Sequence, residues 1–216
     1  MNKNYQFLTL TGVGIIALLL LMSIFTAFQN NSFYSSFLGK IQTSERRVNG
    51  EILDRNEAFL QITGENLRHW DVPHYERIKN NGYRNTEGNQ ASILYEYAFY
   101  PVFPAIWRIT HLDVVWICLL NYMFYILGLI ILFSVYGSGF RMKERIILFA
   151  SLLFLPSTVV FLIPYSEASF FLFVSISIWA YLNRKYPLFF IAMVLATMTR
   201  RVSFVLLGAS VFSAVL

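Results

Sequence analysis

The feature that most constrains this fold is an uncharged run of 22 residues from Phe7 to Phe28. About 20 apolar residues in a helix cross a hydrocarbon core of about 30 Å. The run therefore predicts a transmembrane helix. A signal peptide is the alternative, but the run exceeds the roughly 7–15 apolar residues of a signal peptide and no clear A-x-A cleavage site follows it. We expect a retained helix over residues 7–28.

Four further apolar runs predict an all-α, polytopic membrane protein. They cover residues 114–136, 146–165, 166–183 and 187–216. As one helix, the last run would be about 45 Å long at about 1.5 Å per residue, so we expect it to break near Arg200. The composition agrees, because 56% of the residues are hydrophobic and 13% are charged, against about 25% charged residues in soluble proteins.

The segment between the first two runs, residues 29–113, is polar. Apolar residues recur in it at loosely helical spacing, namely Ile52, Phe59, Leu60, Leu67 and Trp70. This spacing predicts short helices at the membrane interface. We therefore treat residues 1–216 as a single membrane domain with one large polar loop. Because the chain ends in an apolar run with no polar tail, we expect a C-terminal truncation relative to a longer protein.

The net charge of +5 predicts membrane orientation and not a nucleic-acid partner. Residues 29–113 carry nine Lys/Arg and ten Asp/Glu, so the basic excess lies beside the apolar runs, at Lys3, 141–145, 184–185 and 200–201. Short basic segments mark the cytoplasmic side of membrane helices. We expect a cytoplasmic N-terminus and an extracytoplasmic loop 29–113, in a bacterial cytoplasmic membrane or the endoplasmic reticulum.

Chemistry-bearing residues are densest around Asp71, in the sequence WDVPHY at 70–75. Asp71 can cap a helix that has Pro73 in its first turn and stops at Gly82. Alternatively, Asp71 lies just outside the bilayer and acts as a general base that takes a proton from a sugar hydroxyl. The spacing alone leaves both interpretations open.

Glu167 is the only acidic residue after position 145, and the turn that holds it joins two apolar runs. An ionisable group at a membrane boundary is costly, which favours a functional role. Alternatively, Glu167 lies in headgroup water and accepts a hydrogen bond from Tyr165 or Ser166. No metal or cofactor is expected, because the histidines lack ligand spacing and Cys118 is a lone cysteine.

Arg200 follows Pro187 by 13 residues, so a helix places it about 20 Å into the bilayer. It then approaches the outer side, where Asp71 and Glu167 are expected. The planar guanidinium binds oxyanions through two parallel hydrogen bonds, which suits a lipid-linked phosphate. The alternatives are an ion pair with Glu167, or a misplaced span whose arginines end a short cytoplasmic loop.

Five short motifs resemble the PIG-V family of GPI mannosyltransferases and their bacterial relatives, within the GT-C class. They are WDVPHYERIKNNGY at 70–83, AFYPVFP at 98–104, Pro156-Ser157, PYSEASFF at 164–171 and LATMTRR at 195–201. The resemblance implies a GT-C-like helical bundle. One departure is Arg200-Arg201-Val202-Ser203, where bacterial relatives often have Arg-Pro-x-Gly, which affects the expected backbone break and donor contacts.

The resemblance also implies an activity. A sugar, usually mannose, passes with inversion from a lipid-linked donor, a polyprenyl phosphate, to a glycan or glycolipid acceptor at the extracytoplasmic face. Asp71 is then the catalytic base, and the donor and acceptor are bound by His74, Tyr75, Tyr165, Glu167, Arg200 and Arg201. Two alternatives stay open: a transporter or flippase of lipid-linked intermediates that uses Glu167 and Arg200 as switches, and an inactive fragment or accessory subunit.

Overall fold

The computed structural model describes residues 3–29, 47–48, 51–52, 67–68, 70–83, 96–202, 205 and 208. These residues are mainly helical, with one antiparallel pair of two-residue strands, β1 (Arg47–Val48) and β2 (Glu51–Ile52). The predictions for Phe59, Leu60 and most of the last apolar run beyond Val202 lie outside the described residues.

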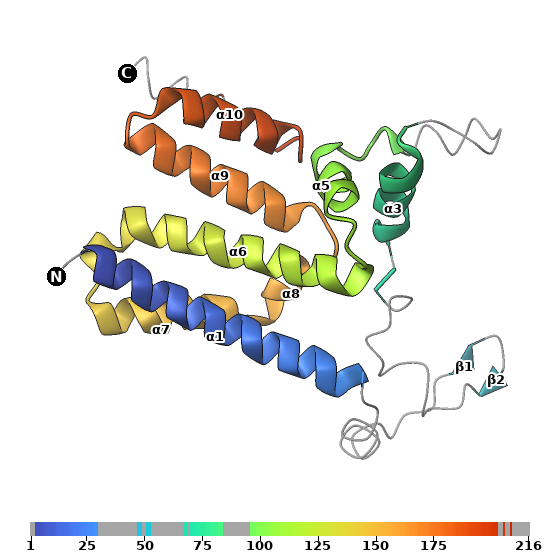
Figure 1. Cartoon of the computed structure of the whole chain (residues 1–216), viewed down its shortest axis with the longest axis horizontal. Helices are drawn as coiled ribbons and strands as arrows, with labels where there is room; N and C mark the ends of the chain where they lie inside the picture. The colour runs from blue at the N-terminus through green and yellow to red at the C-terminus, as the bar shows by residue number, and fades with distance from the viewer. Residues whose placement is uncertain are drawn as a thin grey trace.

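Two of the described helices, α1 (Lys3–Gln29) and α6 (Val114–Tyr136), are long and apolar enough to cross a membrane. They contain the first two predicted spans. Helix α6 runs through the middle of the bundle, with α1 and α7 (Met142–Leu153) on one side and α9 (Glu167–Leu182) on the other (Figure 1). The chain is therefore a membrane protein built on a helical bundle.

The third predicted span, 146–165, is not one continuous helix. Helix α7 ends at Leu153, the short 3-10 helix η2 (Pro156–Thr158) follows, and α8 (Val159–Leu162) leaves at an angle of 58°. Pro156 has no backbone N–H, and its ring would clash with the preceding helical turn. The break frees carbonyl groups at the end of α7, which must find other donors.

Helix α6 supplies those donors. The hydroxyls of Tyr122 and Tyr125 donate to the carbonyls of Leu153 and Leu152, over 3.0 and 2.9 Å. The fully buried amide of Asn121 donates to two carbonyls in the segment between α8 and α9. Polar side chains on the otherwise apolar helix α6 thus donate hydrogen bonds to the carbonyls that the break leaves without partners. Such carbonyls need a partner because an unpaired polar group is costly in a low-dielectric environment.

Helices α9 and α10 (Tyr186–Thr197) form an antiparallel hairpin that crosses back to the end where α9 begins (Figure 1). Their bounds follow the predicted span 166–183 and the start of the predicted run 187–216. Helix α10 ends at Thr197, three residues before Arg200 and close to the expected break. The hairpin therefore returns the chain to the neighbourhood of Glu167.

Two short helices from the polar segment, α3 (Val72–Asn81) and α5 (Val102–Thr110), lie at that same end (Figure 1). Phe103 and Trp107 of α5 are fully buried against α3 and the first turns of α6. Pro73 lies in the first turn of α3, and Gly82 ends the helix with a φ of 67° that suits glycine. We call α3 and α5 together the α3–α5 unit.

Candidate functional site

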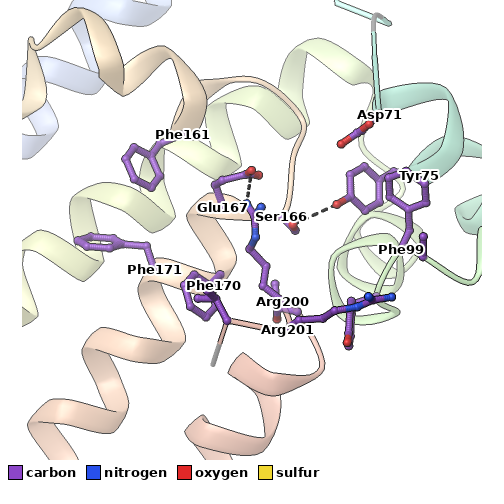
Figure 2. Close-up of a pocket in the computed structure, with 14 residues that line it drawn as sticks. Asp71, Tyr75, Phe99, Phe161, Ser166, Glu167, Phe170, Phe171, Arg200 and Arg201 are labelled. Atoms are coloured by element: carbon purple, nitrogen blue, oxygen red, sulfur yellow. Dashed lines mark hydrogen bonds and ion pairs between the residues drawn. The ribbon is translucent and has the colours of Figure 1, made fainter. Parts of the chain in front are cut away.

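A cavity of about 610 Å³ lies where the α3–α5 unit meets the start of α9 and the end of α10. Five of the seven predicted site residues line it, namely Asp71, Tyr75, Glu167, Arg200 and Arg201. The other lining residues include Ser166, Thr199 and several aromatic side chains (Figure 2). Residues from both halves of the chain therefore share one site.

Asp71 occupies the N-cap position of α3, but only its backbone caps the helix. Its carbonyl accepts hydrogen bonds from the N–H groups of His74 and Tyr75, over 3.1 and 3.2 Å. Its exposed carboxylate makes no capping hydrogen bond. The capping interpretation thus accounts for the backbone carbonyl of Asp71 and not for its side chain. The carboxylate can therefore interact with a ligand in the cavity.

Glu167 forms an ion pair with Nη1 of Arg200 (Figure 2). This pair joins the first residue of α9 to the segment after α10, and its side chains are 22% and 42% exposed. The structure therefore contains the ion pair between Arg200 and Glu167 that was one of the sequence-based alternatives. Arg201 is exposed and also lines the cavity, so a second arginine lies at this site.

A buried hydrogen bond holds the two carboxylates at the same cavity. The Tyr75 hydroxyl donates to Oγ of Ser166 over 3.0 Å. Tyr75 lies one helical turn after Asp71, and Ser166 immediately precedes Glu167. Burial raises the pKa of Tyr75 to about 12, so its phenol keeps the proton that this bond requires at neutral pH.

Two predicted site residues, His74 and Tyr165, are not among the residues lining the cavity. His74 stacks on Phe99 at a ring-centroid distance of 4.7 Å, so it lies against a residue of the wall. Its Nδ1 is 2.8 Å from Nη2 of Arg77 and can only accept there, because arginine has no acceptor. Burial and the charge of Arg77 lower the pKa of His74, which favours neutral imidazole. Tyr165 instead packs against the aromatic cluster around Trp107.

Aromatic side chains make up much of the apolar wall. Phe99 packs edge-on against Tyr75 at 5.1 Å, and its carbonyl accepts a hydrogen bond from Tyr83 over 2.7 Å. On the opposite side, Phe161 and Phe171 contact each other at 5.5 Å. These flat apolar surfaces line the same cavity as the two carboxylates and the two arginines, an arrangement suited to an amphiphilic ligand.

Several residues that line the cavity were not predicted from the sequence. Ser166, Phe170 and Phe171 belong to the PYSEASFF motif, and Phe99 to AFYPVFP, so membership of these motifs was the available signal. Phe161 lies outside the motifs and reaches the cavity through the bend before α8. Within the part of the chain that the structure describes, no group of three His, Cys, Asp or Glu side chains is placed to hold a metal.

Comparisons with models of protein families, with curated proteins and with solved structures found no match to this chain. The resemblance to the PIG-V family stays a prediction from its motifs.

Proposed function

We propose that the chain is an integral-membrane, inverting glycosyltransferase. Its donor is a sugar, with mannose the first candidate, on a polyprenyl phosphate, and its acceptor is a glycan or glycolipid. The supporting observation is one cavity that is lined by Asp71, by two arginines and by aromatic side chains, where the carboxylate of Asp71 makes no capping hydrogen bond. A lipid-linked sugar phosphate has a complementary set of groups: hydroxyls, a phosphate and apolar surface.

In the proposed reaction, Asp71 accepts the proton of an acceptor hydroxyl as that oxygen attacks the anomeric carbon. The new glycosidic bond forms on the face opposite the departing phosphate, which explains inversion. The bond between the anomeric carbon and the phosphate oxygen breaks, and the polyprenyl phosphate leaves with the electron pair. The proton remains on Asp71 until solvent removes it.

The guanidiniums have the complementary role. Arg200 and Arg201 stabilise the negative charge that develops on the departing phosphate, so it leaves without being protonated. Glu167 holds Arg200 through the observed ion pair and keeps one guanidinium directed at the cavity. The phosphate then meets positive charge that is positioned before the reaction begins.

The proposal places the cavity on the extracytoplasmic side. In the described bundle, the basic turns at 141–145 and 184–185 lie at the end opposite the α3–α5 unit (Figure 1). Basic turns favour the cytoplasmic side. The opposite end, with Asp71, then faces outward, where a sugar donor that has crossed the bilayer can enter.

The test is Asp71→Asn in the full chain, reconstituted with radiolabelled polyprenyl-phosphate mannose and a glycolipid acceptor. Loss of the base should reduce transfer by roughly 10²- to 10⁴-fold while membrane insertion persists. Glu76→Gln is the matched control, because Glu76 lies on the same helix, pairs with Arg68 and does not line the cavity. Normal transfer by Asp71→Asn would refute the proposal. Movement of the donor across the bilayer without new glycosidic bonds would favour the transporter alternative.

A further inference from the structure

The end of the bundle opposite the cavity carries most of the basic residues of the helical turns. The turn between α6 and α7 and the turn between α9 and α10 lie there together (Figure 1). The charged residues of these two turns and of the first turn of α7 are Arg141, Lys143, Glu144, Arg145, Arg184 and Lys185. We call this region the basic end. Glu144 is the only acidic residue among these residues, and it pairs with Arg141 over 2.9 Å. The other basic residues therefore give the region an excess of positive charge.

An apolar groove of about 220 Å³ lies between α6, α9 and α10, next to the α9–α10 turn. Its wall includes Tyr136 at the end of α6, Ile178 and Tyr181 near the end of α9, and Phe189 and Met193 on α10. Helix α10 rises about 1.5 Å per residue, so Met193 lies about 12 Å along the helix from Lys185. That length matches part of a phospholipid acyl chain.

The turn beside this groove holds two cations on a well-defined backbone. The N–H groups of Arg184 and Lys185 donate to the carbonyls of Tyr181 and Ala180, over 3.0 and 2.8 Å. Arg184 is exposed and has a φ of 57°, and Nζ of Lys185 lies 4.6 Å from the ring centroid of Trp179. The helix end thus presents positive charge directly after the groove residues of α9.

We propose that the groove and the two cations bind one anionic phospholipid of the bilayer. An acyl chain occupies the groove, and the phosphate lies at Arg184 and Lys185. Basic pockets beside membrane helices bind anionic headgroups in this way. A second copy of the chain is the less suitable occupant, because two basic ends repel each other. The site is separate from the cavity, and its occupation does not depend on glycosyl transfer.

The test is native mass spectrometry of the full chain, stripped of lipid and then mixed with equal amounts of phosphatidylglycerol and phosphatidylcholine. Each cation near the surface should favour the anionic lipid about 5-fold, and the pair about 30-fold. Arg184→Gln combined with Lys185→Gln should bring the preference close to equality. Ile178→Trp fills the groove but leaves both cations, and should reduce retention of phosphatidylglycerol.

The matched control is Arg108→Gln, compared with Arg184→Gln alone. Arg108 is exposed on α5, at the other end of the molecule, so its loss removes the same charge away from the groove. Only Arg184→Gln should lower the preference. An equal loss in Arg108→Gln would show general surface attraction and overturn the proposal. An unchanged preference in the double variant, or a lipid-free dimer as the main species, would also overturn it.

Discussion

The two sides of the cavity are fixed by different physical means. On the bundle side, α6 and α9 pack so closely that a Cβ added at Gly128 would lie 2.7 Å from the ring of Phe171. On the other side, the α3–α5 unit is held by an aromatic cluster around Trp107 and by the hydrogen bond from Tyr75 to Ser166. Glu167 and Arg200 therefore stand on a closely packed support. Asp71 stands on a unit whose position depends on fewer contacts, so it can be disturbed without unfolding the bundle.

The largest expected effect comes from the bundle side. Gly128→Leu inserts a branched side chain where even a methyl group would overlap Phe171. We expect the free energy of unfolding in detergent to fall by about 3 kcal/mol, the upper part of the range for overpacking. Gly12→Leu is the matched control, because no atom lies within 4 Å of a Cβ built at Gly12. An equal loss of unfolding free energy in both variants would mean that the contact between Gly128 and Phe171 does not stabilise the bundle side of the cavity.

An intermediate effect is expected at Asn121, which lies between the two sides. Its amide donates to the carbonyls of Ile163 and Tyr165, over 2.7 and 3.0 Å, just before Ser166. Asn121→Leu removes both hydrogen bonds. The Tyr165 carbonyl loses this donor, whereas the Ile163 carbonyl keeps the N–H of Tyr165 over 2.7 Å, so we expect a loss of about 2 kcal/mol in the free energy of unfolding.

The matched control for this prediction is Asn183→Leu. Asn183 donates to a single carbonyl at an exposed turn, where water can replace its amide. We expect a loss of at most about 0.5 kcal/mol there. A similar loss of unfolding free energy in the two variants would contradict the prediction that the Asn121 hydrogen bonds stabilise the fold more than an exposed one does.

The smallest effect on stability is expected at Tyr75. Tyr75→Phe removes the hydrogen bond to Ser166 but keeps the ring, so the unfolding free energy should fall by about 1 kcal/mol. Transfer should fall several-fold more than it does in Tyr97→Phe, a control at an exposed tyrosine. Unchanged transfer in Tyr75→Phe would show that the α3–α5 unit holds Asp71 without this bond.

The pH dependence of stability tests the same bond. The pKa of Tyr75 is about 12 in the folded chain, against an ordinary value of 10.0. Above pH 10 the unfolded state loses this proton first, so the unfolding free energy falls as the pH rises from 10 to 12. The stability advantage of the wild type over Tyr75→Phe should therefore shrink by about 1 kcal/mol between pH 8 and pH 11. A constant difference would contradict the burial of the phenol.

Part of the site was predictable because it depends on local patterns. Pro73 and Gly82 set the bounds of α3, and Arg201 was assigned to the site from its motif. The ring direction of His74 was not predictable, because it depends on stacking with Phe99, which contacts His74 only in the folded chain. The choice among the interpretations of Glu167 also needed the structure, since Arg200 is 33 residues away.

The sequence by itself determined the helical segments and their apolar character. Uncharged runs of sufficient length can satisfy their backbone groups only within helices in a lipid environment. Only the tertiary structure decided how the break at Pro156 is accommodated, because tyrosines on α6 donate to the carbonyls that the break frees. It also decided that Asp71, Glu167 and Arg200 share a cavity. Packing between distant segments sets those positions, and no local pattern specifies such packing.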